Sequence, residues 1–185
     1  MEKKSTSEVM IFDDHCLPKK DKVLFALFAL RPLLRLNFFK NIVKKRLKHC
    51  ENVIIRPDIS FVYGKIYAKN VLLSDTEFVD FSPIYIGEGT KFMHNNMVIT
   101  THHDLKEYRK IISRPIHIGK NVIITTNCTI LGGVSIGDNS VIGSGSLVIK
   151  DIPANCLAYG VPAKPVRFFK KGERGDNLSG KITYP

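Results

Sequence analysis

Aliphatic residues return at every sixth position in the later part of the chain. The run consists of Ile118, Ile124, Ile130, Ile136, Ile142 and Val148. A six-residue period fits neither the 3.6-residue turn of a helix nor the two-residue alternation of a half-buried strand. It is typical of a chain that winds around a triangular prism, in which each hexapeptide makes one flat side and one corner. The pattern therefore predicts an all-β solenoid whose aliphatic side chains stack inside the prism.

The positions around this run support the same interpretation. Glycine often follows the aliphatic residue, as at Gly119, Gly137 and Gly143, and we expect it to allow the tight corners. A weaker rhythm precedes the clear one. Its first members recur every six residues at Ile54, Ser60, Ile66, Leu72, Phe78 and Ile84. The same spacing then restarts two residues later, at Ile86, Phe92 and Val98. We interpret this change as a slip of the phase by two residues at a bulge of the coil.

The rhythm is interrupted between residues 100 and 115. The next apolar position would be occupied by Asp104, and the pattern resumes only at Ile118. This segment is therefore predicted to be a loop that leaves the prism, and loops on rigid scaffolds commonly carry function. We divide the chain into an N-terminal arm and helical segment (1–50), a β-helix domain with the loop at 100–115 (51–167) and a C-terminal tail (168–185).

Residues 21–48 combine apolar and basic character. The apolar run from Val23 to Leu30 is interrupted by Arg31 and Pro32, so a membrane-spanning helix is not expected. The proline favours two short helices with a break between them. Two roles fit this segment: a cap over the open end of the prism, or an interfacial helix that touches anionic lipid.

The formal net charge of +11 favours an anionic partner, which could be nucleic acid, lipid or a phosphorylated ligand. The basic residues gather near the chain ends without a nucleic-acid-binding module, so we expect no nucleic-acid partner. The four cysteines form no CxxC pair, and the opening MEKKSTSE does not resemble a signal peptide. We therefore expect a cytoplasmic protein, peripheral at the inner membrane face if residues 21–48 are interfacial.

The segment from Pro115 to Arg167 closely resembles the hexapeptide-repeat acyltransferases. It is most similar to the maltose and galactoside O-acetyltransferases and to O-acetyltransferases of bacterial surface-polysaccharide biosynthesis. Two motifs carry the resemblance, SVIGSGSLVIKDIP followed by GVPAKPVR, and IGEGTKFMHNNMVITTHHD. The resemblance implies a left-handed parallel β-helix and a homotrimer with active sites between subunits. It also implies acetyl-CoA as donor and direct transfer of the acetyl group to a hydroxyl.

By the spacing of this family, the catalytic histidine falls on His103. Histidine titrates near neutrality, so it can accept the proton of a hydroxyl and return it to a departing thiolate. His102 is the alternative base, because a shift of one residue would exchange the two; otherwise it lines the loop. Asp104 either orients an imidazole, contacts the acceptor or is an ordinary carboxylate of the loop surface.

The acceptor site is less clearly marked. Asp75 lies where maltose-type enzymes use an asparagine, and it either contacts the acceptor or shapes a turn. The chain has no tryptophan, so stacking against a sugar would fall to Tyr85, Tyr108 or another ring.

The resemblance also places residues along coenzyme A. Those expected near the pantetheine arm are Thr126, Ser144, Gly145 and Lys150. Lys164 and Arg167 match positions near the nucleotide phosphates, which need cations. Three of these residues also have a purely structural interpretation. Thr126 could be an ordinary residue of a coil corner, and Lys164 and Arg167 could belong to a solvated basic tail.

A metal enzyme is not expected. The related zinc-dependent carbonic anhydrases need three histidine ligands, and His94, His103 and His117 lack the closely spaced pair. The sequence thus predicts an acetyl-CoA-dependent O-acetyltransferase for a sugar or glycan precursor. Two alternatives stay open: transfer to another acceptor (an amino sugar, serine or an antibiotic) and a non-catalytic β-helix scaffold.

Overall fold

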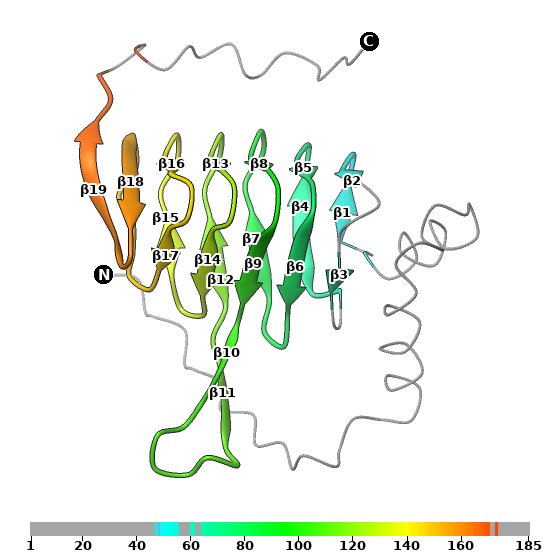
Figure 1. The fold of residues 1–185 in the computed structure, drawn as a ribbon. Helices are drawn as coiled ribbons and strands as arrows, with labels where there is room; N and C mark the ends of the chain where they lie inside the picture. Colours follow the sequence, from blue (N-terminus) through cyan, green and yellow to red (C-terminus); the bar gives the residue numbers. More distant parts are fainter. Residues whose placement is uncertain (1–46, 48, 56–59, 62–63, 171–172, 174–185) are drawn as a thin grey trace, which may run out of the picture.

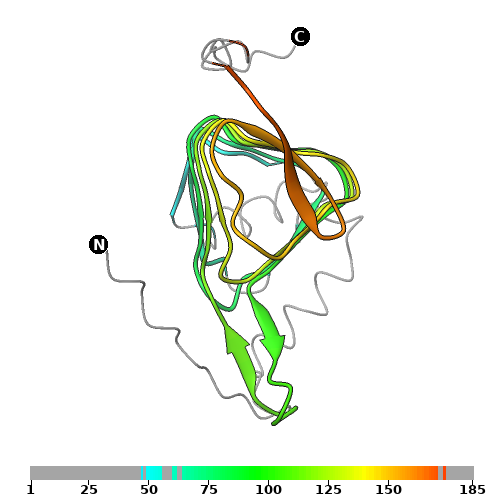
Figure 2. The ribbon, with the colours of Figure 1, turned by 90° about the vertical axis from the view of Figure 1, so that its left-hand side faces the viewer.

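The computed structural model describes residues 47, 49–55, 60–61, 64–170 and 173. Within these residues all regular structure is β, and the chain winds into a left-handed parallel β-helix of triangular cross-section (Figures 1 and 2). The fold predicted from the six-residue period is therefore confirmed. The predicted helices within residues 21–48 lie outside the described residues, apart from Leu47. Over the described ranges, no helix is long and apolar enough to cross a membrane.

Three parallel sheets form the sides of the prism, here called sides A, B and C. Side A consists of β1 (Cys50–Glu51), β4 (Ile66–Lys69), β7 (Ile84–Ile86), β12 (Ile116–Ile118) and β15 (Ser135–Ile136). Side B consists of β2 (Ile54–Ile55), β5 (Leu72–Leu73), β8 (Lys91–Phe92), β13 (Ile123–Ile124), β16 (Val141–Ile142) and β18 (Cys156–Gly160). Side C consists of β3 (Ser60–Phe61), β6 (Thr76–Val79), β9 (Asn96–Ile99), β14 (Thr129–Leu131) and β17 (Leu147–Val148). At one end, β19 (Ala163–Phe168) pairs antiparallel with β18.

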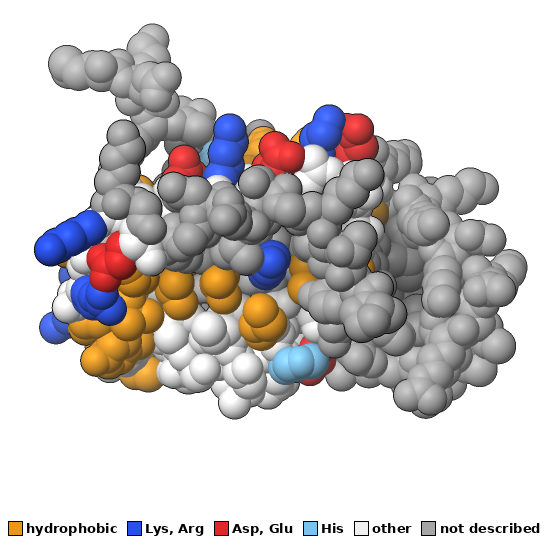
Figure 3. All heavy atoms as spheres, turned by 90° about the horizontal axis from the view of Figure 1, so that it is seen from above, with side chains coloured by type: hydrophobic (Ala, Val, Ile, Leu, Met, Phe, Trp, Pro, Cys, Tyr) orange, Lys and Arg blue, Asp and Glu red, His pale blue; other side chains and the backbone are white. Residues whose placement is uncertain are grey.

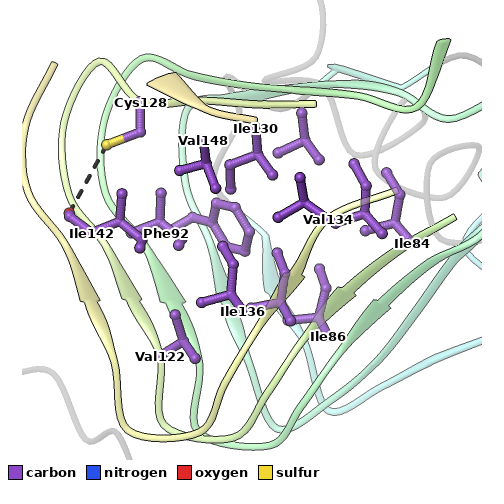
Figure 4. Packing of buried hydrophobic residues seen from close by; sticks show 14 of the residues in the cluster. Ile84, Ile86, Phe92, Val122, Cys128, Ile130, Val134, Ile136, Ile142 and Val148 are labelled. Atoms are coloured by element: carbon purple, nitrogen blue, oxygen red, sulfur yellow. Dashed lines mark hydrogen bonds between the residues drawn. The ribbon is translucent and has the colours of Figure 1, made fainter. Parts of the chain in front are cut away.

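The predicted aliphatic columns form the core. All six residues of the run from Ile118 to Val148 are at most 3% exposed. Figure 4 shows Ile130, Ile136, Ile142 and Val148 of this run inside the prism. Phe78 and Phe92 pack edge to face, with ring centroids 5.6 Å apart. Each buried aliphatic side chain contributes about 1.5–3 kcal/mol by leaving water. The prism is therefore held together by its interior.

The early coils differ from the predicted rhythm. Ile84 and Ile86 lie on the same strand and are both buried, so their two-residue offset is the ordinary alternation of a strand. Phe61, rather than Ser60, lies opposite Phe78 in the register of side C. Corners of unequal length cause these differences, because extra residues at a corner shift the phase while the strands stay stacked.

Asparagine makes most of one column of corners, with Gly89 (φ 77°) on one coil. Between sides A and B, five asparagines have φ between 48° and 58°: Asn52, Asn70, Asn121, Asn139 and Asn155. Asparagine tolerates this left-handed conformation better than most residues. Their amides also link successive coils, as in the 3.0 Å hydrogen bond from Asn139 Nδ2 to Asn155 Oδ1.

Gly119, at the same corner, is required for space rather than for a positive φ. A Cβ added there would lie 2.2 Å from Asp138 Oδ1. The prediction that the repeat glycines allow tight corners therefore needs correction, since here the glycine lets two coils approach each other.

An antiparallel hairpin leaves the corner between sides C and A. It consists of β10 (Thr101–His103) and β11 (Ile111–Ser113), and it projects away from the prism in Figures 1 and 2. Buried polar groups anchor its base. The Ser113 hydroxyl donates to Ser82 Oγ at 2.6 Å, and the Ser82 main-chain N–H donates to Thr100 Oγ1 at 3.1 Å. These hydrogen bonds fix the point at which the chain leaves the prism.

Candidate active site

His103 is held by the hairpin that carries it. Its Nδ1 lies 2.7 Å from the main-chain oxygen of Tyr108, and the two rings stack with centroids 4.4 Å apart and planes 10° apart. A carbonyl oxygen only accepts hydrogen bonds, so Nδ1 carries the hydrogen and Nε2 keeps its lone pair. His103 is therefore exposed, oriented and in the tautomer that a general base requires.

His102 occupies the neighbouring position of the same strand. It pairs with Ile112 across the hairpin, whereas His103 pairs with Ile111. Successive side chains of a strand point to opposite faces, so the two imidazoles face different directions. The contact with Tyr108 distinguishes His103 from its neighbour.

Asp104 shapes the turn of the hairpin. Its Oδ1 accepts hydrogen bonds from the main-chain N–H groups of Glu107 and Lys106, at 3.0 Å and 2.7 Å. These two bonds hold the pKa of the Asp104 carboxyl below its usual value, and the bond from Glu107 lowers it more than the bond from Lys106. The turn that Asp104 caps brings Tyr108 back beside His103.

Asp75 lies at the corner between sides B and C. It adopts a φ of 37°, and its Oδ2 accepts a 3.0 Å hydrogen bond from the main-chain N–H of Asn95. Asn95 Nδ2 in turn donates to Asn127 Oδ1 at 2.5 Å. Among the described residues, Asp75 thus begins a column of corner residues, and its contact with an acceptor stays a prediction.

The predicted pantetheine residues continue this corner on later coils. The Gly145 N–H donates to the Thr126 main-chain oxygen at 2.9 Å, and Ser144 Oγ donates to Thr125 Oγ1 at 3.2 Å. Gly145 has a φ of 73°, and a Cβ added there would meet nothing within 4 Å. The corner therefore offers an open surface at Gly145. Asp75, Thr126, Ser144 and Gly145 form one edge of the prism, which we call the B–C edge.

Lys150 lies at the opposite edge of side C. It follows β17 and is exposed, at the same column of corners from which the hairpin leaves two coils earlier, after β9. Within one chain, side C thus separates His103 and Lys150 from the residues of the B–C edge.

The two remaining cations lie on β19, at the end of the prism. Lys164 pairs with Tyr159 and Arg167 with Leu157 in the register of β18, and both cations are exposed. Arg167 forms a salt bridge with Glu173 and lies 5.9 Å from the centre of the Phe169 ring. Figure 3 shows Lys and Arg side chains gathered at this end. A phosphate that bound Arg167 would compete with the Glu173 carboxylate.

Tyr85 lies on side A, away from the B–C edge. Its ring stacks between Tyr67 and His117, at centroid distances of 5.0 Å and 4.9 Å. His49 continues the stack below Tyr67 at 4.3 Å. We call these four rings the aromatic ladder. Sequence reasoning missed it, because the hairpin separates Tyr85 from His117 along the chain. Matching the tripeptide Ile-Tyr-Ile at 84–86 with Ile-His-Ile at 116–118, on either side of the interrupted segment, would have aligned the two rings.

The histidines considered as metal ligands do not come together. His94 lies near the corner between sides B and C, His103 on the hairpin and His117 on side A. Across the part of the chain that the structure describes, no three His, Cys, Asp or Glu side chains form a group that could hold a metal ion.

Comparisons with known proteins agree with this architecture. Residues 115–150 match the family model described as bacterial transferase hexapeptide (six repeats). Over 128 residues the chain is 36% identical to a galactoside O-acetyltransferase of Escherichia coli, covering 63% of this chain and 61% of that protein. The chain spans about three fifths of the length of the first curated relatives that it matches.

Solved structures give the same result. A galactoside acetyltransferase in complex with coenzyme A superposes with a TM-score of 0.71 at 31% identity, with 86% of each chain covered. A maltose O-acetyltransferase from Clostridium difficile superposes with a TM-score of 0.72 at 29% identity, covering 82% of this chain and 85% of that one.

Proposed function

Because this chain belongs to the hexapeptide-repeat acetyltransferase family, we propose that it transfers the acetyl group of acetyl-CoA to a hydroxyl of a sugar or glycan precursor. The observation that carries the proposal is the orientation of His103 by Tyr108. A sugar hydroxyl is a poor nucleophile at neutral pH, whereas a thioester is already an activated acyl donor. The missing component is a positioned base, and the free Nε2 of His103 supplies it.

The reaction then follows from this tautomer. Nε2 takes the proton of the acceptor hydroxyl while the oxygen attacks the carbonyl carbon of the thioester. When the tetrahedral intermediate collapses, the carbon–sulfur bond breaks and the sulfur recovers the proton from the imidazole. The products are the acetyl ester and the free thiol of CoA, and His103 returns to its neutral form. The hydrogen bond to Tyr108 stabilises the imidazolium between the two steps, because a charged donor binds a carbonyl oxygen more strongly.

Coenzyme A is proposed to bind along the B–C edge. Thr126, Ser144 and Gly145 would contact its amide-rich pantetheine arm, and Lys150 would approach from the opposite edge of side C. Lys164 and Arg167 would hold its phosphates at the end of the prism. Support comes from the open surface at Gly145, from the exposed cations on β19 and from the coenzyme A in the matched galactoside acetyltransferase.

The division of these residues between two edges supports a homotrimer. His103 and Lys150 lie at one edge of side C, and the B–C edge is the other, so an adjacent copy would complete each site. Side C also carries an outward column of apolar side chains that a neighbouring copy could cover. The column consists of Val79, Ile99, Leu131 and Ile149, of which Ile149 is 43% exposed. Equilibrium sedimentation is expected to give three times the mass of the chain.

The names of the matched relatives support a sugar as the acceptor. The described cysteines Cys50, Cys128 and Cys156 are free, which suits the cytoplasm that we propose as the location. Contact of residues 21–48 with the inner membrane face stays a prediction, as does a role in polysaccharide biosynthesis. Asp75 and Asp104 stay candidates for the acceptor side, although each already forms hydrogen bonds within its turn.

The proposal is tested by acetyl-CoA-dependent thiol release across a panel of sugars, glycan precursors, amino sugars, serine and aminoglycosides. We expect release that depends on a sugar, together with a product whose acetyl group is removed by mild alkali, as esters are and amides are not. An alkali-stable product would favour the N-acetyltransferase alternative. Acetyl-CoA that neither reacts nor raises the melting temperature would contradict the proposal and favour the scaffold alternative.

A further inference from the structure

We propose that side A carries a second binding site, which holds one ring of a neutral saccharide where the aromatic ladder ends. The ladder follows the strand register of side A, in which Tyr67 lies opposite Tyr85 and Tyr85 opposite His117. Its ring spacings of 4.3 Å to 5.0 Å match the separation of neighbouring strands, which is about 4.8 Å. Each ring inside the stack is therefore covered on both faces.

The ladder stops at His117. The next residue in the register is Ser135, whose small side chain cannot cover the imidazole, and both residues are exposed. One face of the His117 ring is thus left open at the spacing of one further ring. A planar or chair-shaped ring placed beside Ser135 would continue the stack.

The open face belongs to a groove of about 820 Å³. Its lining includes three of the four rings, together with Ser135, Asp138 and Asp151. Gly119, which also lines the groove, has no side chain to fill it. A Cβ at this position would collide with the Asp138 carboxylate. A groove of this size is within the range of about 300–1,000 Å³ that small-molecule sites occupy.

Two carboxylates face this groove. Asp138 Oδ1 accepts the Lys120 main-chain N–H at 2.7 Å, and Asp151 Oδ1 accepts the Ser135 main-chain N–H at 2.8 Å. Each bond uses one oxygen and fixes the carboxylate, which leaves the second oxygen to accept a hydrogen bond from a ligand hydroxyl. An aromatic face beside fixed carboxylates suits a sugar ring, whose C–H groups stack while its hydroxyls donate.

Among the groove's lining residues the two carboxylates outnumber the one cation, Lys120, so the groove suits a neutral saccharide better than phosphorylated coenzyme A. The inference rests on the proposed function in one respect. A glycan acceptor held on side A and at His103 would be retained at a high effective concentration. The groove would then favour oligosaccharides over monosaccharides as acceptors.

The test is titration of the full chain with maltotriose and with lactose, followed by NMR of the histidine ring protons. The His117 signal is assigned by its loss in His117→Gln. We expect saccharide to shift this signal in the wild type and in Ser135→Ala, which keeps the slot open. In Ser135→Tyr an added ring would continue the ladder and fill the slot, so we expect the shift to require at least tenfold more saccharide. Thermal unfolding checks that each variant is folded.

Three results would overturn the inference. In the first, saccharide shifts the NMR signal of His103 but not that of His117. In the second, the His117 signal shifts at the same saccharide concentration in Ser135→Tyr and Ser135→Ala, and in the third it shifts with protein concentration and not with saccharide. The readout is binding, so it is independent of turnover. If the proposed function fails, no thiol is released. If this inference fails, the His117 signal does not shift when saccharide is added.

Discussion

The prism and the hairpin are built in opposite ways. In the prism, Phe92 and Ile130 are completely buried, whereas in the hairpin Leu105 is fully exposed and Tyr108 is 74% exposed. Burial stabilises the prism, while main-chain pairing and a few polar contacts hold the hairpin. Stability and the proposed chemistry therefore lie in separate parts of this chain. The rigid coils fix where the hairpin begins, and the hairpin exposes His103, the proposed base.

Removing a core ring is expected to have the largest effect on stability. Phe92→Ala should lower the free energy of unfolding by about 3–5 kcal/mol, because it leaves a cavity beside Phe78 that the coils cannot close. Leu105→Ala is the matched control in the hairpin and should change it by less than about 0.5 kcal/mol. Urea denaturation measures both. Similar losses in the two variants would show that the hairpin is part of the core.

The base of the hairpin should be the next most sensitive region. Ser113→Ala removes the donor to Ser82 Oγ and leaves a buried hydroxyl without that partner, at a cost of about 1–3 kcal/mol. Ser135→Ala, at an exposed serine, is the control and should leave the free energy of unfolding nearly unchanged. Urea denaturation measures both variants. In Ser113→Ala, amide hydrogens of β10 and β11 should also exchange faster. An unchanged exchange rate there would contradict an anchoring role.

The ring of Tyr108 should matter for turnover more than for stability. Tyr108→Ala keeps the main-chain oxygen but removes the stacking on His103, which is worth about 0.5–1.5 kcal/mol. We expect kcat/KM for acetyl transfer to fall by up to about tenfold on that basis. Tyr108→Phe keeps the ring and should stay close to the wild type. If Tyr108→Phe falls as far as Tyr108→Ala, the hydroxyl and not the stacking is responsible.

The turn at Asp104 should give the smallest effect, visible in acid. Its pKa is lower in the folded chain, so its contribution is fully present above the ordinary value of 3.8 and is lost as the pH falls through the lowered folded value. Amide signals of Lys106 and Glu107 should therefore move together in an acid titration. Asp104→Asn removes this titration, and a titration that persists in that variant would assign it to another group.

Sequence reasoning succeeded where one residue type repeats at a fixed spacing. The aliphatic run predicted the core, and the missing apolar residue at Asp104 predicted where the chain leaves the prism. It missed features that depend on the distance between coils. The hairpin separates Tyr85 from His117 along the chain, although strand pairing places them side by side.

Main-chain groups give no sequence signal either. The carbonyl that fixes the His103 tautomer could belong to any residue, so the partner role of Tyr108 was not predictable. Asn139 and Asn155 likewise could be recognised as corner residues only from their positive φ. The separation of the expected site residues by side C follows from the number of residues at each corner, which the six-residue rhythm does not specify.

The most direct test of the account compares His103→Ala with His102→Ala in acetyl transfer to the sugar identified by the panel. We predict that kcat/KM falls by about 10²–10⁴-fold in His103→Ala, with acetyl-CoA affinity and thermal stability unchanged. His102→Ala, on the opposite face of the same strand, should stay within a few-fold of the wild type. Equal activity of the two variants, or a larger loss in His102→Ala, would contradict the assignment of His103 as the base.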